Sequence, residues 1–155
     1  MSYEYLDLAI EKSRESVNEG GFPVGAVVAV GGEVISTGIS NGKILSDPSS
    51  HAEMVAIRKA CTEIGSRNLG KTAILYSSME PCLMCYGASV WASIPRLVFA
   101  IRRESLSPQH FEGDHNLNGI NASTRRPINL IHAASFERQA LSIVEQWETL
   151  QEARL

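Results

Sequence analysis

Four side chains in two short segments have the types and spacing that metal-dependent chemistry requires. His51 and Glu53 stand two residues apart at the start of an expected helix, and Cys82 and Cys85 form a Cys-x-x-Cys pair directly after Pro81. In a reducing compartment such a pair indicates metal binding or redox chemistry, and a structural disulfide is the weaker interpretation. Taken alone, the pair is equally typical of a structural zinc knuckle.

The combination with His51 favours a catalytic zinc ion. Proline is favourable at the first helical position, so Pro81 predicts a helix that places Cys82 and Cys85 on one face. A helix N-terminus lowers thiol pKa values and favours the thiolates that zinc binds. His51, at the tip of the other helix, would be the third ligand. Three protein ligands leave one position of a tetrahedral zinc open, as in catalytic sites.

Glu53 is expected to carry protons and not to bind the metal. Residues at i and i+2 do not share a helical face, but at a helix N-terminus His51 can lean along the axis while Glu53 projects from the first turn. Two thiolates cancel the charge of Zn²⁺ and make its bound water less acidic, so a nearby base becomes valuable. Glu53 would take that proton and pass it to a ring nitrogen and then to a departing amine. A solvated surface carboxylate is the alternative.

The elements that must position these residues alternate along the chain as in an α/β layered domain with a mixed sheet. Apolar spacing and turn residues predict helices over residues 2–18, from His51 onward, after Pro81 and over 135–155, and strands over 24–30, 33–39, 72–78, 96–101 and 127–132. Residues 102–126 have no clear period and are expected to form a long loop, which in a compact domain is usually functional or disordered.

Composition limits the classes of protein to which the chain can belong. Its 155 residues, 44% of them hydrophobic, suit a single domain over residues 1–155 with one core. With 14 Lys and Arg against 17 Asp and Glu, the formal charge of −3 gives no global positive field, which disfavours a nucleic-acid partner. The sequence has no apolar run of about 18 residues, and its N-terminus is acidic where a signal peptide would be basic. Both features predict a cytoplasmic protein without a membrane span.

The order H-A-E and then Pro-Cys-x-x-Cys is the signature of zinc-dependent base deaminases. The segments GGFPVGAVV, SDPSSHAEMVAIRKAC, MEPCLMCYGASVWA and RLVFA resemble bacterial guanine deaminases and, less closely, tRNA adenosine deaminases and fungal-type cytosine deaminases. The resemblance to this cytidine-deaminase-like superfamily covers residues 2–101. It implies a three-layer α/β/α sandwich around a five-stranded mixed sheet, one zinc ion per chain and at least a homodimer.

The same resemblance implies contacts with a bound base. Asn41 would hydrogen-bond the base, the amide of Ala52 would contact the ring, and the carbonyl of Glu80 would contact the departing amino group. Trp91 has the cysteine-to-tryptophan spacing of guanine deaminases and is a candidate substrate contact, with core packing as the alternative. Asn41 could instead be a turn residue beside Gly42.

The segment HFEGDH resembles the acidic segment through which guanine deaminases place a second carboxylate against the purine. Asp114, ahead of Glu112, is therefore the expected auxiliary acid. The spacing of the acids departs from the guanine deaminase pattern, and NLNGINASTRR has no counterpart in it. Glu112, Asp114 and His115 could alternatively bind a second metal ion. Trp147, on the last helix, could pack in the core or form a lid.

These residues predict hydrolytic deamination of a free nucleobase, guanine ahead of cytosine. Tyr86 replaces the alanine that tRNA adenosine deaminases tend to carry, and a bulky side chain near the pocket would leave less room for a polynucleotide. A tRNA adenosine deaminase is an alternative, with the pairs 102–103 and 125–126 as its local basic residues. A non-catalytic module with structural zinc would need a fourth ligand, for which Cys61 is the remaining cysteine.

Overall fold

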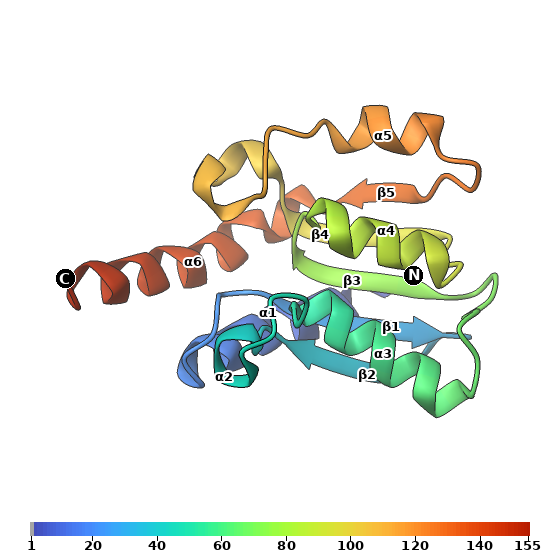
Figure 1. The fold of residues 1–155 in the computed structure, drawn as a ribbon, viewed down its shortest axis with the longest axis horizontal. Coiled ribbons are helices and arrows are strands. Elements are labelled where there is room, and N and C mark those ends of the chain that lie inside the picture. The colour runs from blue at the N-terminus through green and yellow to red at the C-terminus, as the bar shows by residue number, and fades with distance from the viewer. Residues whose placement is uncertain (1) are drawn as a thin grey trace.

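The computed structural model describes residues 2–155 and places a five-stranded mixed sheet between layers of helices (Figure 1). In chain order the elements are α1 (Tyr3–Asn18), β1 (Gly25–Val30), β2 (Glu33–Ile39), α2 (Gly42–Leu45), α3 (Ala52–Ile64), β3 (Ile74–Met79), α4 (Leu83–Trp91), β4 (Arg96–Ile101), α5 (Leu117–Ser123), β5 (Asn129–His132) and α6 (Glu137–Glu152). The strand order is β2-β1-β3-β4-β5. β1 is antiparallel to both of its neighbours, whereas β3, β4 and β5 are parallel.

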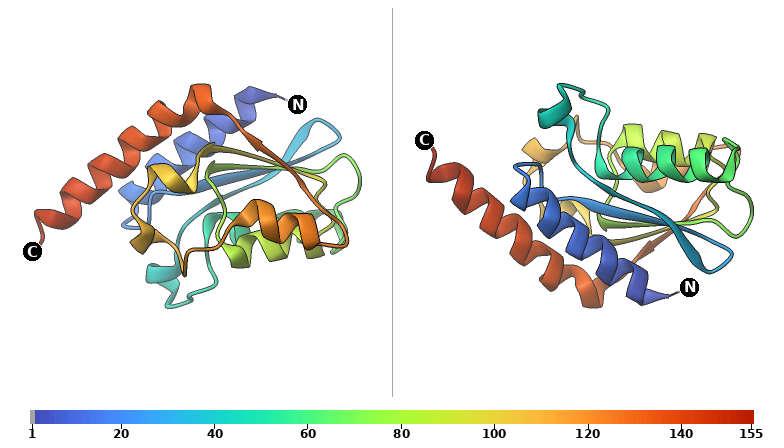
Figure 2. Two further views of the ribbon diagram at one scale, coloured as in Figure 1. Left: turned by 90° about the horizontal axis from the view of Figure 1, so that it is seen from above. Right: turned by 90° about the horizontal axis from the view of Figure 1, so that it is seen from below.

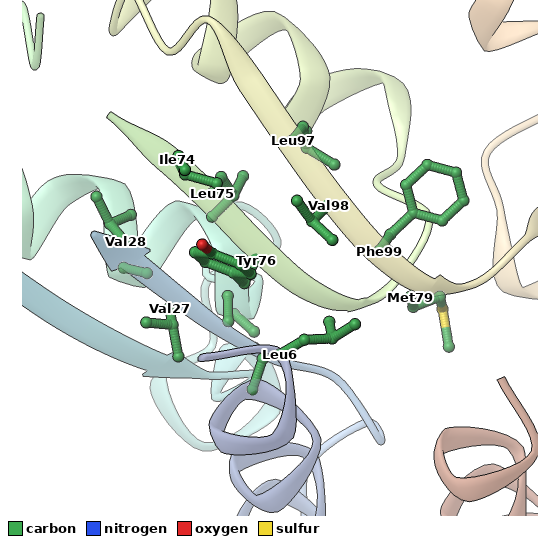
Figure 3. Packing of buried hydrophobic residues seen from close by; sticks show 14 of the residues in the cluster. Leu6, Val27, Val28, Ile74, Leu75, Tyr76, Met79, Leu97, Val98 and Phe99 are labelled. Carbon is green, nitrogen blue, oxygen red and sulfur yellow. The ribbon is translucent and has the colours of Figure 1, made fainter. Parts of the chain in front are cut away.

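The helices cover both faces of the sheet, which confirms the predicted three-layer sandwich. α1 and α6 lie on one face, and α3, α4 and α5 lie on the other (Figure 2). β3 is buried along its whole length, as expected of a central strand with helices on both sides. Figure 3 shows core side chains of β1, β3 and β4, with Leu6 reaching them from α1. Among residues 2–155, no helix is long and apolar enough to span a membrane.

Of the two helices that carry the chemistry, α3 begins beside His51 as predicted, whereas α4 begins later than the sequence predicted. α3 begins at Ala52 with His51 as its N-cap, and α4 begins at Leu83 with Cys82 as its N-cap. The prediction that Pro81 is the first helical residue is therefore wrong. Pro81 instead lies in the short connection from β3, and Cys82 has extended backbone angles. Two of the three metal-ligand candidates, His51 and Cys82, thus lie directly before the first residue of a helix.

The prediction of a single long loop over residues 102–126 is also wrong. This segment contains two short 3-10 turns, Arg103–Ser105 and Pro108–His110, and the helix α5. α5 has low helix propensity because of its asparagine and glycine residues, but Asn116 caps it by accepting a hydrogen bond from the Gly119 N–H. Only Leu117 of this helix is buried, so the sequence carries little helical periodicity. The closing helix is α6, preceded by a 3-10 turn.

Gly38 on β2 allows the start of α3 to lie against the sheet. A Cβ atom at position 38 would lie only 2.2 Å from the carbonyl oxygen of Ala52 and 2.8 Å from the nitrogen of Ala56. We therefore expect Gly38→Ala to lower the free energy of unfolding by about 1–3 kcal/mol, because backbone atoms must move. Urea denaturation measures this change. As a control, Gly87→Ala on α4 adds a Cβ with no atom within 4 Å and should not destabilise the chain. Equal stability of Gly38→Ala and the wild type would contradict the packing argument.

Candidate functional site

The N-termini of α3 and α4 meet at one corner of the molecule, where three metal-binding side chains converge. Nδ1 of His51 lies 3.5 Å from Sγ of Cys82 and 3.6 Å from Sγ of Cys85. All three ligand atoms lie within 4.8 Å of one another. Cys85 is buried, and His51 is partly buried at the wall of a cavity. The three residues that the sequence predicted as ligands are therefore brought together.

This donor set fits a tetrahedral zinc ion. Zinc binds sulfur at about 2.3 Å and nitrogen at about 2.0–2.1 Å, so tetrahedral angles place a sulfur and a nitrogen ligand about 3.6 Å apart. The two sulfur-to-nitrogen distances of 3.5 and 3.6 Å match this value. Within residues 2–155, no other group of three His, Cys, Asp or Glu residues could hold a metal ion. The geometry therefore supports three protein ligands and an open fourth position.

The protonation of the ligands already favours metal binding at Cys82. Hydrogen bonds from Cys85 and His51 lower the pKa of the Cys82 thiol to about 4. The pKa of Cys85 is raised by the interaction with Cys82, by burial and by the nearby carboxylate of Glu53. The pKa of His51 is raised by its hydrogen bond to Cys82. Zinc binds thiolates, so metal binding would release the proton of the Cys85 thiol.

Glu53 lies behind the ligands, in the first turn of α3. Its side chain is only 4% exposed, and burial raises its pKa. The Ser77 hydroxyl on β3 donates to its Oε1 at 3.1 Å, and the Cys85 thiol donates to its Oε2 at 3.5 Å. A solvated surface carboxylate is thereby ruled out. Glu53 is a buried, oriented carboxylate beside the metal ligands, as general acid–base chemistry requires.

A cavity of about 370 Å³ opens from the metal corner. Its floor includes His51, Ala52, Glu53 and Cys82. The walls come from separate parts of the chain, namely Phe22, Val24, Ser40, Met79, Glu80, Gln109, His110, Phe111 and Trp147. This volume is at the lower end of the range for small-molecule sites, about 300–1,000 Å³. The metal corner therefore faces a compact and largely apolar chamber.

Comparison with known proteins identifies the family. Residues 2–101 match the family model of the cytidine and deoxycytidylate deaminase zinc-binding region. The chain belongs to this deaminase family. The match includes all three ligands and Glu53, and zinc is the metal that the family and the donor set both indicate.

The proteins to which the chain is similar include enzymes with different substrates. The chain is 46% identical to the guanine deaminase of Bacillus subtilis over 101 residues, which are 64% of each protein. It is 37% identical to the tRNA-specific adenosine deaminase of Aquifex aeolicus over 101 residues, 64% of this chain and 66% of the relative. Each match thus spans less than two thirds of the relative. A guanine deaminase structure from Nitrosomonas europaea shares the fold, with a TM-score of 0.82, 22% identity and coverage of 96% and 85% of the two chains.

Three predicted substrate contacts lie at or beside the metal cavity of this chain. Ala52 and Glu80 both line it. Asn41 does not line the cavity, but its neighbour Ser40 does, and Oδ1 of Asn41 accepts a hydrogen bond from the Ser50 hydroxyl at 2.5 Å. The side chain of Asn41 is thereby held next to the residue that precedes His51. Asn41 also precedes α2, a short helix that the sequence prediction missed.

The acidic segment does not lie as predicted. Asp114 lines a separate cavity of about 530 Å³ together with Glu80 and Arg103, and it does not line the metal cavity. The assignment of Asp114 as the auxiliary acid therefore stays a prediction that this geometry does not support. Glu112 is also absent from the walls of the metal cavity, because its carboxylate binds the Leu83 N–H at 2.8 Å. Its predicted contact with the substrate has no support in this geometry.

Two bulky residues of α4 also lie elsewhere than expected. Trp91 is 74% exposed at the end of the helix, so the core alternative is wrong, and the residue does not line the metal cavity. Tyr86 is 3% exposed, but its hydroxyl donates to Asn121 of α5 at 2.6 Å, and it does not face the cavity. Tyr86 therefore does not narrow the cavity, contrary to the prediction. Tyr86 instead anchors α5 to α4.

The alternative of a closed structural zinc site loses its fourth ligand. Cys61 lies near the opposite end of α3 from His51 and packs, partly buried, against the core. Cys61 therefore behaves as a small hydrophobic side chain and not as a metal ligand. No second metal cluster forms from Glu112, Asp114 and His115 within residues 2–155.

Most residues of the cavity wall were not predicted as site residues. Phe22, His110 and Trp147 form an aromatic cluster, in which Phe22 is 5.2 Å from His110 and 5.0 Å from Trp147 between ring centroids. His110 and Glu148 of α6 are 3.0 Å apart. Among these residues only Trp147 carried a signal, as a possible lid, and it does line the cavity. The others lie in loops without periodicity, so no local pattern could have grouped them.

Proposed function

We propose that the chain is a hydrolytic deaminase of a free nucleobase, with guanine ahead of cytosine. The observation that carries this proposal is the compact cavity of about 370 Å³, which joins the open side of a three-ligand metal site to the buried carboxylate of Glu53. Deaminases of this type need a place where a metal-activated water, a proton carrier and a base ring meet. The 46% identity to a guanine deaminase supports guanine as the first candidate.

The roles of the residues follow from their positions. Zinc at this site supplies a Lewis acid that makes water nucleophilic near neutral pH. Glu53 accepts one proton of that water and delivers it to the ring nitrogen, and it then passes the second proton of the water to the amine, which departs as ammonia. Ser77 fixes Oε1 of Glu53 and leaves Oε2 on the side of Cys85. Burial raises the pKa of Glu53 and thereby makes the carboxylate a better base, which suits a group that must both take up and release a proton.

The cavity walls supply surfaces that suit a planar, polar ring. Phe22 and Trp147 offer aromatic faces, while Ser40, Glu80 and Gln109 offer hydrogen-bonding groups. Oε2 of Glu80 accepts the Arg103 N–H at 2.7 Å, which leaves Oε1 for a ring N–H donor. Glu80 therefore replaces Asp114 in the proposal as the acceptor for the substrate. Asn41, held by Ser50 through Oδ1, is proposed to donate to the base through Nδ2.

Adenosine in a transfer RNA is the second candidate. The 37% identity to a tRNA-specific adenosine deaminase favours it. Against it stand the net charge of −3, which does not attract phosphates, and Glu148 next to the cavity residue His110. We retain the small base as the first candidate, together with a cytoplasmic homodimer as the predicted state of the protein.

A substrate panel tests the proposal. Zinc-loaded protein is incubated with guanine, cytosine, adenine, guanosine and an adenosine-containing anticodon stem-loop, and released ammonia is measured. We expect guanine to be turned over with the highest kcat/KM. Ammonia from cytosine but not from guanine would reverse the ranking. Turnover of the stem-loop alone, with a rate that falls as salt rises, would establish the second candidate.

A further inference from the structure

Both helices at the metal corner begin without the usual capping interaction. The first N–H groups of a helix have no partner within it, and an N-cap side chain normally accepts a hydrogen bond from one of them. Here the N-cap residues are His51 and Cys82, and neither makes a side-chain cap hydrogen bond. Their side chains point to each other at the metal site instead. Neither α3 nor α4 is therefore capped by the side chain of its own N-cap residue.

Glu112 supplies the missing partner for α4. Its Oε1 accepts a hydrogen bond from the N–H of Leu83, the first residue of that helix, at 2.8 Å. A carboxylate at a helix N-terminus also interacts favourably with the helix dipole. Burial acts to raise the pKa of Glu112, but backbone hydrogen bonds and the charges of Arg103 and His115 outweigh burial and lower it. Glu112 is therefore a stable anion at this position, directly beside the ligand Cys82.

The segment that carries Glu112 also forms one wall of the cavity. Gln109, His110 and Phe111 line the cavity immediately before Glu112. Arg103 contacts this segment at two points. Its guanidinium donates to the Gly113 carbonyl at 2.5 Å and lies 4.0 Å from the centroid of the Phe111 ring. The Glu112 hydrogen bond thus joins the wall of the cavity to the helix that carries the two cysteine ligands.

We propose that Glu112 is a positioning residue that caps α4 in place of Cys82 and couples the cavity wall to the metal site. The cap holds the start of α4 and, with it, Cys82 and Cys85 at their distances from His51. The wall formed by residues 109–111 is held over the metal by the same contact. The effect on catalysis rests on the proposed deaminase function, whereas the effect on the metal does not. This role differs from that of an auxiliary acid, since Glu112 exchanges no proton with a substrate.

The test compares Glu112→Ala with Glu112→Gln in the zinc-loaded protein. Glutamine keeps an oxygen that can accept the Leu83 N–H, whereas alanine does not. We expect amide hydrogen exchange at Leu83 to be faster in Glu112→Ala and close to wild type in Glu112→Gln. The rate of zinc transfer to a chelator should likewise be higher for Glu112→Ala and close to wild type for Glu112→Gln. Residues that orient metal ligands typically change metal affinity or activity by about 10–100-fold, so kcat/KM of Glu112→Ala should fall by that factor while Glu112→Gln remains within a few-fold.

Glu104→Ala is the matched control, because Glu104 is an exposed acid in the same segment and makes no hydrogen bond or ion pair within residues 2–155. It should leave exchange, zinc transfer and activity unchanged. Loss of activity in Glu112→Gln with normal exchange and zinc retention would overturn the proposal in favour of proton transfer by Glu112. Unchanged exchange at Leu83 in Glu112→Ala would also overturn it. The exchange and zinc measurements need no substrate, so they remain decisive if no nucleobase is turned over.

Discussion

Glu53→Gln is expected to keep its zinc and to lose turnover by on the order of 10²–10⁴-fold, the usual contribution of a general acid–base group. Glutamine has nearly the same shape, and its oxygen can still accept the hydrogen bond of the Ser77 hydroxyl. Its amide faces the Cys85 sulfur, where it can donate to a thiolate. The ligands therefore keep their positions, but an amide cannot carry a proton from water to an amine. Metal analysis and ammonia release with the best substrate of the panel measure the two outcomes.

Glu63→Gln is the matched control, because Glu63 lies on the same helix but is exposed. It should retain both zinc and activity. Wild-type turnover in zinc-loaded Glu53→Gln would remove Glu53 from the mechanism. Loss of zinc in this variant would instead indicate that the carboxylate contributes to the metal site. The distinction matters because Oε2 of Glu53 lies as close as 3.5 Å to the ligand Cys85.

The metal site was predictable because its geometry is nearly local. Cys82 and Cys85 are three residues apart, and the N-cap and first turn of one helix hold both of them. His51 and Glu53 likewise occupy the N-cap and first turn of another helix. Once the two helix N-termini meet, the residue types leave one arrangement, with three ligands and one base. The five-stranded sheet was predictable for the same reason, since each strand is a short apolar segment between turn residues.

The substrate side of the site was not predictable in this way. Whether Asp114 faces the metal or the neighbouring cavity depends on how the whole segment after β4 is folded, and Arg103 decides this through its contacts with Gly113 and Phe111. An arginine that organises a loop has no sequence signature. Trp91 was predicted to be in the core or near the substrate, but its side chain is exposed. Near the end of α4, the apolar character of a residue does not show which way its side chain faces. Spacing relative to Cys85 placed it correctly on the helix but not on the cavity side.

The aromatic cluster of Phe22, His110 and Trp147 was even less predictable from the sequence than the position of Asp114. Phe22 follows α1, His110 lies in a 3-10 turn after β4, and Trp147 lies on α6, yet their rings are in contact. Three segments separated by tens of residues meet here because α1 and α6 pack on the same face of the sheet (Figure 2). The cavity wall therefore comes from parts of the chain in which sequence patterns are weak. The matched region ends at residue 101, before two of these three segments begin.

Replacing Cys85 with alanine is expected to abolish zinc binding and, with it, all activity. Cys85 is fully buried and its sulfur lies 3.6 Å from Nδ1 of His51, so no solvent-exposed side chain can take its place. The variant should also lose the stability that the metal provides. Zinc binds the folded chain, and the unfolded chain has no preformed site, so the binding free energy stabilises the folded state. At a free zinc concentration of 100 times Kd this contribution is about 2.7 kcal/mol. For a chain of this size, that corresponds to a shift in Tm of roughly 5–10 °C.

The decisive measurement is the difference in Tm between zinc-loaded and chelator-treated protein, together with zinc content. The wild type should show a shift of this size, whereas Cys85→Ala should show none. Cys61→Ala is the matched control, because Cys61 packs against the core away from the metal corner. It should bind zinc and respond to the chelator as the wild type does. A zinc-replete and active Cys85→Ala protein would refute the three-ligand site, and loss of zinc in Cys61→Ala would favour the closed structural site that a non-catalytic module requires.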